Sequence, residues 1–180
     1  MMFTDTILSR WSPREYSAKT INDNDLKTIF ESVRWAQSSF NEQPWRYLIA
    51  RKGSPKRKSL EELLSAGNHY AFEADILGVA FAKDAFSHND VPNRSAQHDL
   101  GAANQILTLT AWTLGINARM MAGFDNQKAR TLAPTGFDPM AMFVLGYATE
   151  KALKEGPGDR KRRNATEYVW NGEWEEPFFK

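Results

Sequence analysis

A loop from Ser38 to Trp45 carries the densest group of side chains that could bind a ligand. It combines two hydroxyls, two carboxamides, a proline and a tryptophan, in the order Ser38-Ser39-Phe40-Asn41-Glu42-Gln43-Pro44-Trp45. Such small polar groups can donate and accept hydrogen bonds around a polyhydroxylated ligand, and Pro44 is expected to restrict Gln43 to extended conformations. Polar loops are also common as simple connections, so this stretch alone favours an ordinary connection.

Two arginine-rich stretches could bind an oxyanion. The first reads Arg10-Trp11-Ser12-Pro13-Arg14, in which Pro13 pushes Ser12 out of helical geometry and so predicts a fixed turn. The second reads Asp159-Arg160-Lys161-Arg162-Arg163. Guanidinium groups form forked, charge-assisted hydrogen bonds with oxyanions. A solvated basic turn and a solvated tail are the alternative interpretations of these stretches.

Two further sets of residues contain groups that could bind a ligand or a metal. At Ala122-Gly123-Phe124-Asp125, a short strand is expected to turn into a helix, and a glycine there would let backbone N–H groups approach a flat ligand. A positive φ angle at Gly123 is the alternative explanation. The spacing of His88, Asp90 and His98 matches no ligand pattern, so no metal site is predicted.

Hydrophobic periodicity predicts the elements that must position these groups. Strands are expected at 46–50, 76–83, 117–121 and 140–147, and helices at 4–8, at 25–33 with Asn24 or Asp25 as cap, at 54–66 before Gly67, at 99–114 and after a cap at Asp125. The segment 76–83 is continuously apolar, which is typical of a strand buried on both faces. The helix at 99–114 is apolar nearly all round and is expected in the middle of the molecule or in a subunit interface.

Composition limits the classes of function. A chain of 180 residues is expected to form one domain, 1–180, and a net charge of +1 gives no general attraction to nucleic acid or membranes. The absence of cysteine excludes disulfides and a cysteine nucleophile and fits a cytoplasmic location, and no signal peptide is recognised. From residue 148 onward the chain becomes rich in charges and aromatic rings, so the extension 148–180 is expected to dock on its own body or on a second subunit.

These signals agree with one another when they are taken in order. The motifs Arg10-x-Ser12-x-Arg14, Ser38-Ser39-x-Asn41-x-Gln43-Pro44-Trp45, Gly123-Phe124-Asp125 and the basic cluster at 160–163 together resemble the FMN-dependent nitroreductase family. The resemblance implies a three-layer α+β fold in which helices cover a mixed central sheet. It also implies a homodimer that exchanges the C-terminal extension and binds FMN at the subunit interface.

The resemblance also implies a set of cofactor-binding residues: Arg10, Trp11, Ser12, Arg14, Ser38, Ser39, Asn41, Gln43, Asn68, Ala122, Gly123, Arg160, Arg162 and Arg163. In this set the phosphate would be held by Arg10 and Ser12, joined by the C-terminal arginines. Because Asn164 stands where the family often has proline, Arg163 is an alternative to its neighbouring arginines.

The flavin ring is expected to meet the other residues of this set. Arg14 would lie at the N1/C2-carbonyl edge, where a cation stabilises the charge of reduced flavin. Ser39 and Asn41 would face the ribityl chain or the ring edge, and Asn68 the pyrimidine edge. The backbone N–H groups of Ala122 and Gly123 would approach N5 and O4, a contact that alanine at 122 permits.

The chemistry implied is a ping-pong cycle in which FMN takes hydride from NAD(P)H and reduces a nitroaromatic or quinone type of acceptor. No catalytic side chain is needed, because the flavin N5 does the chemistry. Three alternatives remain open. A family relative could perform reductive dehalogenation or flavin fragmentation, the chain could be a non-enzymatic FMN-binding or sensory protein, or residues 160–163 could bind nucleic acid. The nearly neutral charge disfavours the last.

Overall fold

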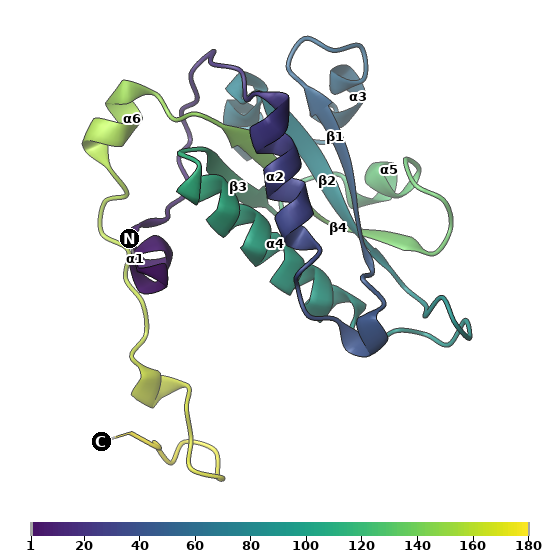
Figure 1. Ribbon diagram of the computed structural model, residues 1–180, viewed down its shortest axis with the longest axis vertical. Helices are drawn as coiled ribbons and strands as arrows, with labels where there is room; N and C mark the ends of the chain where they lie inside the picture. The colour runs from purple at the N-terminus through teal and green to yellow at the C-terminus, as the bar shows by residue number, and fades with distance from the viewer. Residues whose placement is uncertain (1, 180) are drawn as a thin grey trace.

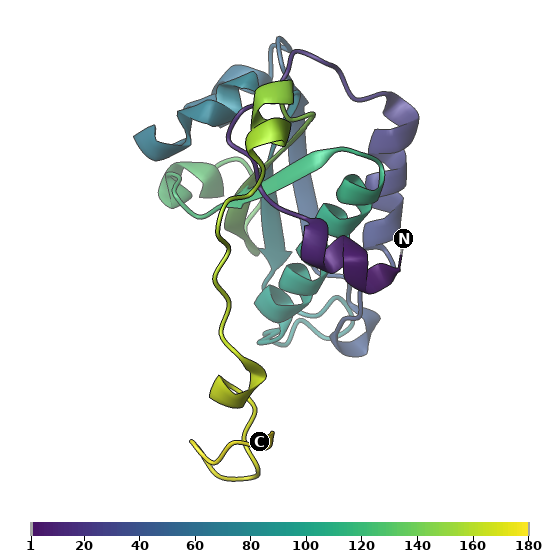
Figure 2. The same cartoon turned by 90° about the vertical axis from the view of Figure 1, so that its left-hand side faces the viewer.

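A four-stranded sheet forms the middle layer of the computed structural model, which describes residues 2–179. Its strands are β1 (Trp45–Arg51), β2 (Ile76–Lys83), β3 (Asn117–Met121) and β4 (Phe137–Gly146), in the order β1-β2-β4-β3. Helices α2 (Asp23–Val33) and α4 (Ala96–Thr113) cover one face (Figures 1 and 2). Against the other face lie α3 (Arg57–Glu61), the 3₁₀ segment η2 (Ala66–Glu73) and α5 (Asn126–Arg130). The predicted three-layer α+β fold is therefore confirmed. Every strand pairing within residues 2–179 is antiparallel, so the parallel pairing of a mixed sheet is not among them.

Several predicted elements are confirmed at their boundaries. Strands β2 and β3 have the predicted limits, and seven of the eight β2 residues are buried, as the continuous apolar pattern indicates. Asp125 caps α5, since its side chain accepts a hydrogen bond from the amide of Lys128. These signals are local in sequence, and the fold does not override them.

The predicted helix at 54–66 is wrong. Only α3 is helical there, and the 3₁₀ segment η2 runs through Gly67, where the helix was expected to end. The cause is Arg57, whose charged side chain is typical of an exposed helix face but is 2% exposed. It donates to the carbonyl oxygens of Ala50, Ala71 and Ala74, and thereby ties η2 to β1.

Smaller boundary errors have equally local causes. Helix α2 is capped by Asn22, whose side chain accepts from the amide of Asp25, and not by Asn24 or Asp25. Helix α4 begins at Ala96, before the predicted residue 99. Strand β4 begins at Phe137, and Pro139 lies inside it because the register with β2 shifts between Ala80 and Phe81. Such an irregularity accommodates a residue that has no backbone N–H.

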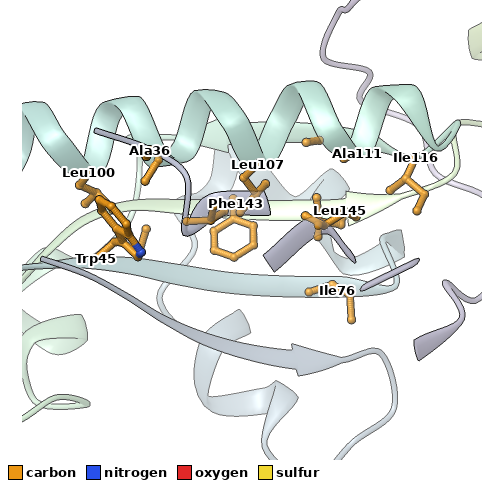
Figure 3. Close-up of a cluster of buried hydrophobic side chains, with 14 of the residues drawn as sticks. Ala36, Trp45, Ile76, Leu100, Leu107, Ala111, Ile116, Phe143 and Leu145 are labelled. Carbon is orange, nitrogen blue, oxygen red and sulfur yellow. The ribbon is translucent and has the colours of Figure 1, made fainter. Parts of the chain in front are cut away.

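The core between the sheet and its helices is centred on Phe143 of β4. Figure 3 shows the side chains of Leu100 and Leu107, from α4, directed toward the layer that contains Trp45 and Phe143. Phe143 is completely buried, and the residue paired with it on β2 is Gly78. A Cβ atom at Gly78 would lie 2.6 Å from Cε1 of Phe143. The glycine therefore makes room for the central ring.

The chain ends lie beside each other before the C-terminal arm leaves the body. Helix α1 (Phe3–Ser9) packs on α4, and the arm passes it after α6 (Glu150–Glu155). Figures 1 and 2 both show the arm, with η3 (Ala165–Glu167), leading away from the sheet. Trp170 and Trp174 contact each other, with ring centroids 4.2 Å apart, and Trp174 is 81% exposed. Docking of this arm on a second subunit stays a prediction. Within residues 2–179, none of the helices has the length and apolar character needed to cross a bilayer.

The packing around Phe143 predicts different effects for the same substitution at two glycines. Gly78→Ala should lower the free energy of unfolding by about 1–3 kcal/mol, because the methyl group overlaps the ring. Gly101→Ala, in α4 with open space around it, should leave stability unchanged or raise it by up to about 1 kcal/mol. Urea unfolding of both variants measures the difference, and equal effects at the two positions would contradict this account of the core.

Candidate functional site

A basic cavity of about 490 Å³ lies where the two ends of the chain meet. It is lined by Ile7, Leu8, Arg10, Gln105, Arg160, Arg162, Arg163 and Tyr168. Arg160 donates hydrogen bonds to the carbonyl oxygens of Arg10, at 2.6 Å, and Leu8. One guanidinium nitrogen of Arg10 in turn lies 3.2 Å from the hydroxyl oxygen of Ser12. The structure thus brings together the two arginine-rich stretches that the sequence singles out.

The charges around this cavity are of one sign. None of the ion pairs within residues 2–179 includes Arg10, Arg160, Arg162 or Arg163. Burial lowers the pKa of Arg10, and the neighbouring charges of Arg160 and Arg162 lower it further. An anion in the cavity would relieve this repulsion and accept several charge-assisted hydrogen bonds.

The Gly123 turn is held by residues of η2 and of the segment before it. The carbonyl oxygen of Gly123 accepts from the Ser65 hydroxyl at 2.8 Å and from Nδ2 of Asn68 at 2.8 Å. A Cβ atom at Gly123 would lie only 2.6 Å from the Ser65 hydroxyl oxygen. The φ angle of Gly123 is not positive, so that alternative explanation is wrong, and the glycine is required by close approach. Ala122, beside it, is exposed.

A chain of hydrogen bonds connects this turn to the N-terminal turn. Tyr70 donates its hydroxyl proton to Oδ1 of Asn68 at 2.9 Å, and Nε of Arg119 donates to the same hydroxyl at 2.8 Å. Arg119 also donates to the carbonyl oxygen of Ser12 at 2.8 Å. The guanidinium carbon of Arg14 lies 5.8 Å from the centre of the Tyr70 ring. The structure therefore groups Ser12, Arg14, Asn68 and Gly123, with the half-buried Trp11 in the same turn.

Sequence reasoning missed three residues of this network: Ser65, Tyr70 and Arg119. Ser65 belongs to the predicted helix at 54–66, which is wrong, and Tyr70 lies beyond it in the 3₁₀ segment η2. Arg119 carried a usable signal, because it is a charged residue at the centre of a short strand whose neighbours on the sequence are apolar. A charge in such a strand needs a partner.

The loop from Ser38 to Trp45 has a strained backbone. Phe40, Asn41 and Gln43 have φ angles of 53°, 54° and 51°, in the left-handed region that non-glycine residues rarely adopt. The predicted extended conformation of Gln43 is therefore wrong. Two hydrogen bonds enforce the conformation: the amide of Gln43 donates to the Ser38 hydroxyl at 3.0 Å, and the amide of Ser39 donates to Asp99 at 2.9 Å.

Glu42 ties this loop to the segment that follows β2. Its carboxylate accepts from the amide and hydroxyl of Ser87, at 2.8 and 2.6 Å, and from the ammonium of Lys83 at 3.2 Å. Beside this contact, Phe40 is 82% exposed and lies with its ring centroid 5.5 Å from that of Phe86. The segment that follows β2 is thus held to the polar loop at Ser87.

None of the residues of the polar loop lines the basic cavity of its own chain. The loop is anchored at Asp99 in the first turn of α4, whereas Ser9, which precedes the Arg10 turn, accepts a hydrogen bond from Trp112 in the last turn. These anchors are thirteen residues apart, or about 20 Å at 1.5 Å per residue. Figure 1 shows α1 and the 38–44 loop toward opposite ends of α4. Ser38, Ser39, Asn41 and Gln43 therefore form one group, and the other predicted residues form another.

His88, Asp90 and His98 gather no further ligands. Within residues 2–179, no three or more histidine, aspartate or glutamate side chains are placed to hold a metal ion.

Comparison with known proteins identifies the class to which this fold and site belong. The model of the Nitroreductase family matches residues 7–79. An uncharacterized 15.4 kDa protein of Mycolicibacterium smegmatis is 32% identical over 147 residues, which cover 73% of this chain and 99% of that protein. A Thermus thermophilus protein named NADH dehydrogenase is 25% identical over 177 residues, covering 80% of this chain and 85% of that one.

Solved structures agree with these sequence matches. The crystal structure of an oxidoreductase containing FMN has a TM-score of 0.86 and 30% identity, and the match covers 95% of this chain and 92% of that one. A protein from Desulfovibrio desulfuricans, solved in complex with FMN, has a TM-score of 0.78 and 25% identity over 99% of this chain and 98% of that one. The three-layer arrangement and the matched sequence define a nitroreductase-like α+β protein. The chain belongs to the nitroreductase family.

The contacts of Glu42 predict that one carboxylate couples the two loops. Glu42→Gln should reduce the free energy of unfolding by about 1–3 kcal/mol, because Ser87 and Lys83 lose a charged acceptor. It should also raise the rate of hydrogen exchange at the Ser87 amide. Glu31→Gln is the matched control, since Glu31 pairs only with exposed Arg34 and should change stability by less than about 0.5 kcal/mol. Equal exchange at the Ser87 amide in wild type and Glu42→Gln would refute the coupling.

The same contacts set a pH dependence. Burial alone would raise the pKa of Glu42, but hydrogen bonds from Ser87 and the charge of Lys83 outweigh it and lower the pKa. The carboxylate therefore stabilises the fold fully above about pH 4.3, the ordinary glutamate value, and loses this contribution as the pH falls through the lower folded-state pKa.

Proposed function

We propose that this chain is an FMN-dependent oxidoreductase that takes electrons from NAD(P)H and reduces an electron-poor acceptor, of the nitroaromatic or quinone type, by a ping-pong mechanism. The observation that carries the proposal is the cavity into which Arg10, Arg160, Arg162 and Arg163 converge without carboxylate partners among the described residues. The FMN in two solved relatives and the NADH in the name of another relative support the choice of cofactor and donor.

The residues fit the different parts of FMN. The phosphate is a dianion, and the basic cavity offers arginines together with the Ser12 hydroxyl nearby. Beyond it, Arg14 lies over the Tyr70 ring and Asn68 accepts from the Tyr70 hydroxyl, so that they offer a cation and an amide to the edge of a flat ring. Gly123 has no side chain to obstruct that ring, and the Ser65 and Asn68 contacts fix the turn. These positions are a proposal for how the chain holds the cofactor.

Bound FMN supplies the redox chemistry, accepting a hydride from NAD(P)H and then delivering electrons to the acceptor. The chain's own residues position the cofactor and hold its charges. Arg14 offers positive charge near the ring, and Asn68 keeps one oxygen lone pair beyond its bonds to Gly123, Ser65 and Tyr70. No side chain is assigned as acid or base, because the proton can come from water.

A second subunit completes the site in this proposal. The polar loop is anchored about 20 Å along α4 from the anchor of the Arg10 turn, so its hydroxyls and amides lie away from the arginines that would hold the phosphate in the same chain. In a two-fold dimer, the loop of one subunit can lie against the basic cavity of the other. The exposed Phe40, with Phe86 and His88 beside it, would then border the acceptor.

The basic cavity predicts the first test of this function. Wild-type protein should bind FMN and its flavin absorbance should bleach when NADH or NADPH is added without oxygen. Arg10→Ala should weaken FMN binding by about 10- to 100-fold, since one charge-assisted contact contributes about 1.5–3 kcal/mol. Arg130→Ala, at an exposed arginine paired with Asp138, should bind FMN as wild type does.

Two results would contradict the proposal in different ways. A protein that shows no spectral or thermal response to added FMN would overturn the cofactor. A protein that binds FMN but does not bleach would be a flavin-binding protein without the oxidoreductase activity.

The separation of the two residue groups predicts complementation between defective subunits. Chains with Arg10→Ala and chains with Ser39→Ala/Asn41→Ala should each form dimers that bind FMN poorly at both sites. Co-expressed and assembled at random, half of the dimers would be mixed, and each mixed dimer would hold one intact site, so about a quarter of all sites should be restored. Flavin content no higher than the mean of the two variants would show that the site lies within one chain.

A further inference from the structure

We infer that Arg119 and Tyr70 form a positioning pair of the candidate flavin site, in which Arg119 supplies a second fixed cation beside Arg14 and favours the binding of reduced over oxidised FMN. This inference rests on the proposed function. It assigns a role to a strand residue that none of the recognised motifs contains.

The position of Arg119 explains why it can act on two parts of the site. It is the third residue of β3 and is paired with Val144 of the buried strand β4. From there it donates to the carbonyl oxygen of Ser12 and to the hydroxyl of Tyr70, both at 2.8 Å. One rigid guanidinium group therefore fixes the distance between the N-terminal turn and η2.

Tyr70 transmits this position to Asn68. Its hydroxyl accepts from Arg119 and donates its only proton to Oδ1 of Asn68. With its oxygen so occupied, Asn68 must direct its Nδ2 toward the carbonyl of Gly123, which lies 2.8 Å away. The orientation of the amide that faces the candidate ring edge is therefore set by Arg119 through Tyr70.

The charge of Arg119 has no carboxylate partner. None of the ion pairs within residues 2–179 includes it, and it is half-buried. Arg14 lies 5.8 Å and Arg119 5.3 Å from the centre of the same Tyr70 ring. Two cations thus share one aromatic ring, an arrangement that a negatively charged ligand would stabilise.

The reaction creates such a charge. A hydride carries two electrons and one proton from NAD(P)H to the ring, NAD(P)⁺ leaves, and the ring keeps one additional negative charge until it gains a proton. A cation that is already in place interacts more strongly with this form than with the oxidised ring. Arg119 should therefore raise the affinity for reduced FMN relative to oxidised FMN.

The test measures both affinities in the FMN-loaded, full-length protein. Arg119→Gln should lower the ratio of reduced to oxidised binding about tenfold, which corresponds to a fall of about 30 mV in the two-electron midpoint potential. Arg119→Lys keeps the charge and should retain the ratio to within about threefold. Arg130→Gln is the matched control and should leave the potential unchanged, since this arginine is exposed and paired with Asp138.

Tyr70→Phe tests the positioning role separately and leaves Arg119 in the protein. Without the hydroxyl, the Asn68 amide is no longer oriented, so oxidised FMN should bind at least fivefold more weakly. Unchanged FMN affinity in Tyr70→Phe would overturn the positioning role, even if Arg119→Gln did not fold. A wild-type midpoint potential in a folded, FMN-loaded Arg119→Gln protein would overturn the role of its charge while the proposed function stood. Failure of the wild type to bind FMN would overturn both.

Discussion

Repulsion among arginines that face one cavity is the constraint on which the candidate site depends. The fold brings Arg160 and Arg162 close enough to Arg10 to lower its pKa, and none of these residues has a carboxylate partner within the described chain. Backbone carbonyl groups offset part of the free-energy cost of this repulsion. Those of Leu8 and Arg10 accept hydrogen bonds from Arg160 and so fix the arm at the point where it passes α1. A dianionic phosphate would neutralise the positive charge of the arginines that the backbone dipoles leave uncompensated.

The sheet and α4 determine which residues lie near this cavity. Helix α4 lies on the sheet through Leu100 and Leu107 and is fixed by the packing around Phe143, so it acts as a rigid spacer between the polar loop and the chain ends. On the opposite face, η2 is close to the N-terminal turn because buried Arg57 holds it to β1. The basic cavity, the N-terminal turn and the Gly123 turn therefore lie near one another in one chain. The polar loop lies away from them along α4.

The sequence predicted the structure correctly where a local signal was not overridden by tertiary contacts. The continuous apolar pattern of β2 and the Asp125 cap predicted their elements correctly, and the order of the motifs indicated the family. It failed where a charged side chain was buried by tertiary contacts. Arg57 looks like a residue of an exposed helix face, and Arg119 looks like an exception in a strand, yet both are held by groups distant in sequence. Their roles depend on carbonyl and hydroxyl positions that no periodicity encodes.

The strained loop shows the same dependence on distant groups and connects it to function. A residue in an unfavourable backbone region costs on the order of 1–3 kcal/mol, and this loop holds three left-handed residues in a row of four. Asp99 and Glu42 over-determine the loop from two sides, through the amide of Ser39 and through Ser87. They leave the ring of Phe40 facing solvent. An exposed aromatic ring fixed at such a cost suits a loop that borders a ligand, and in the proposed dimer it would lie opposite the basic cavity of the second copy.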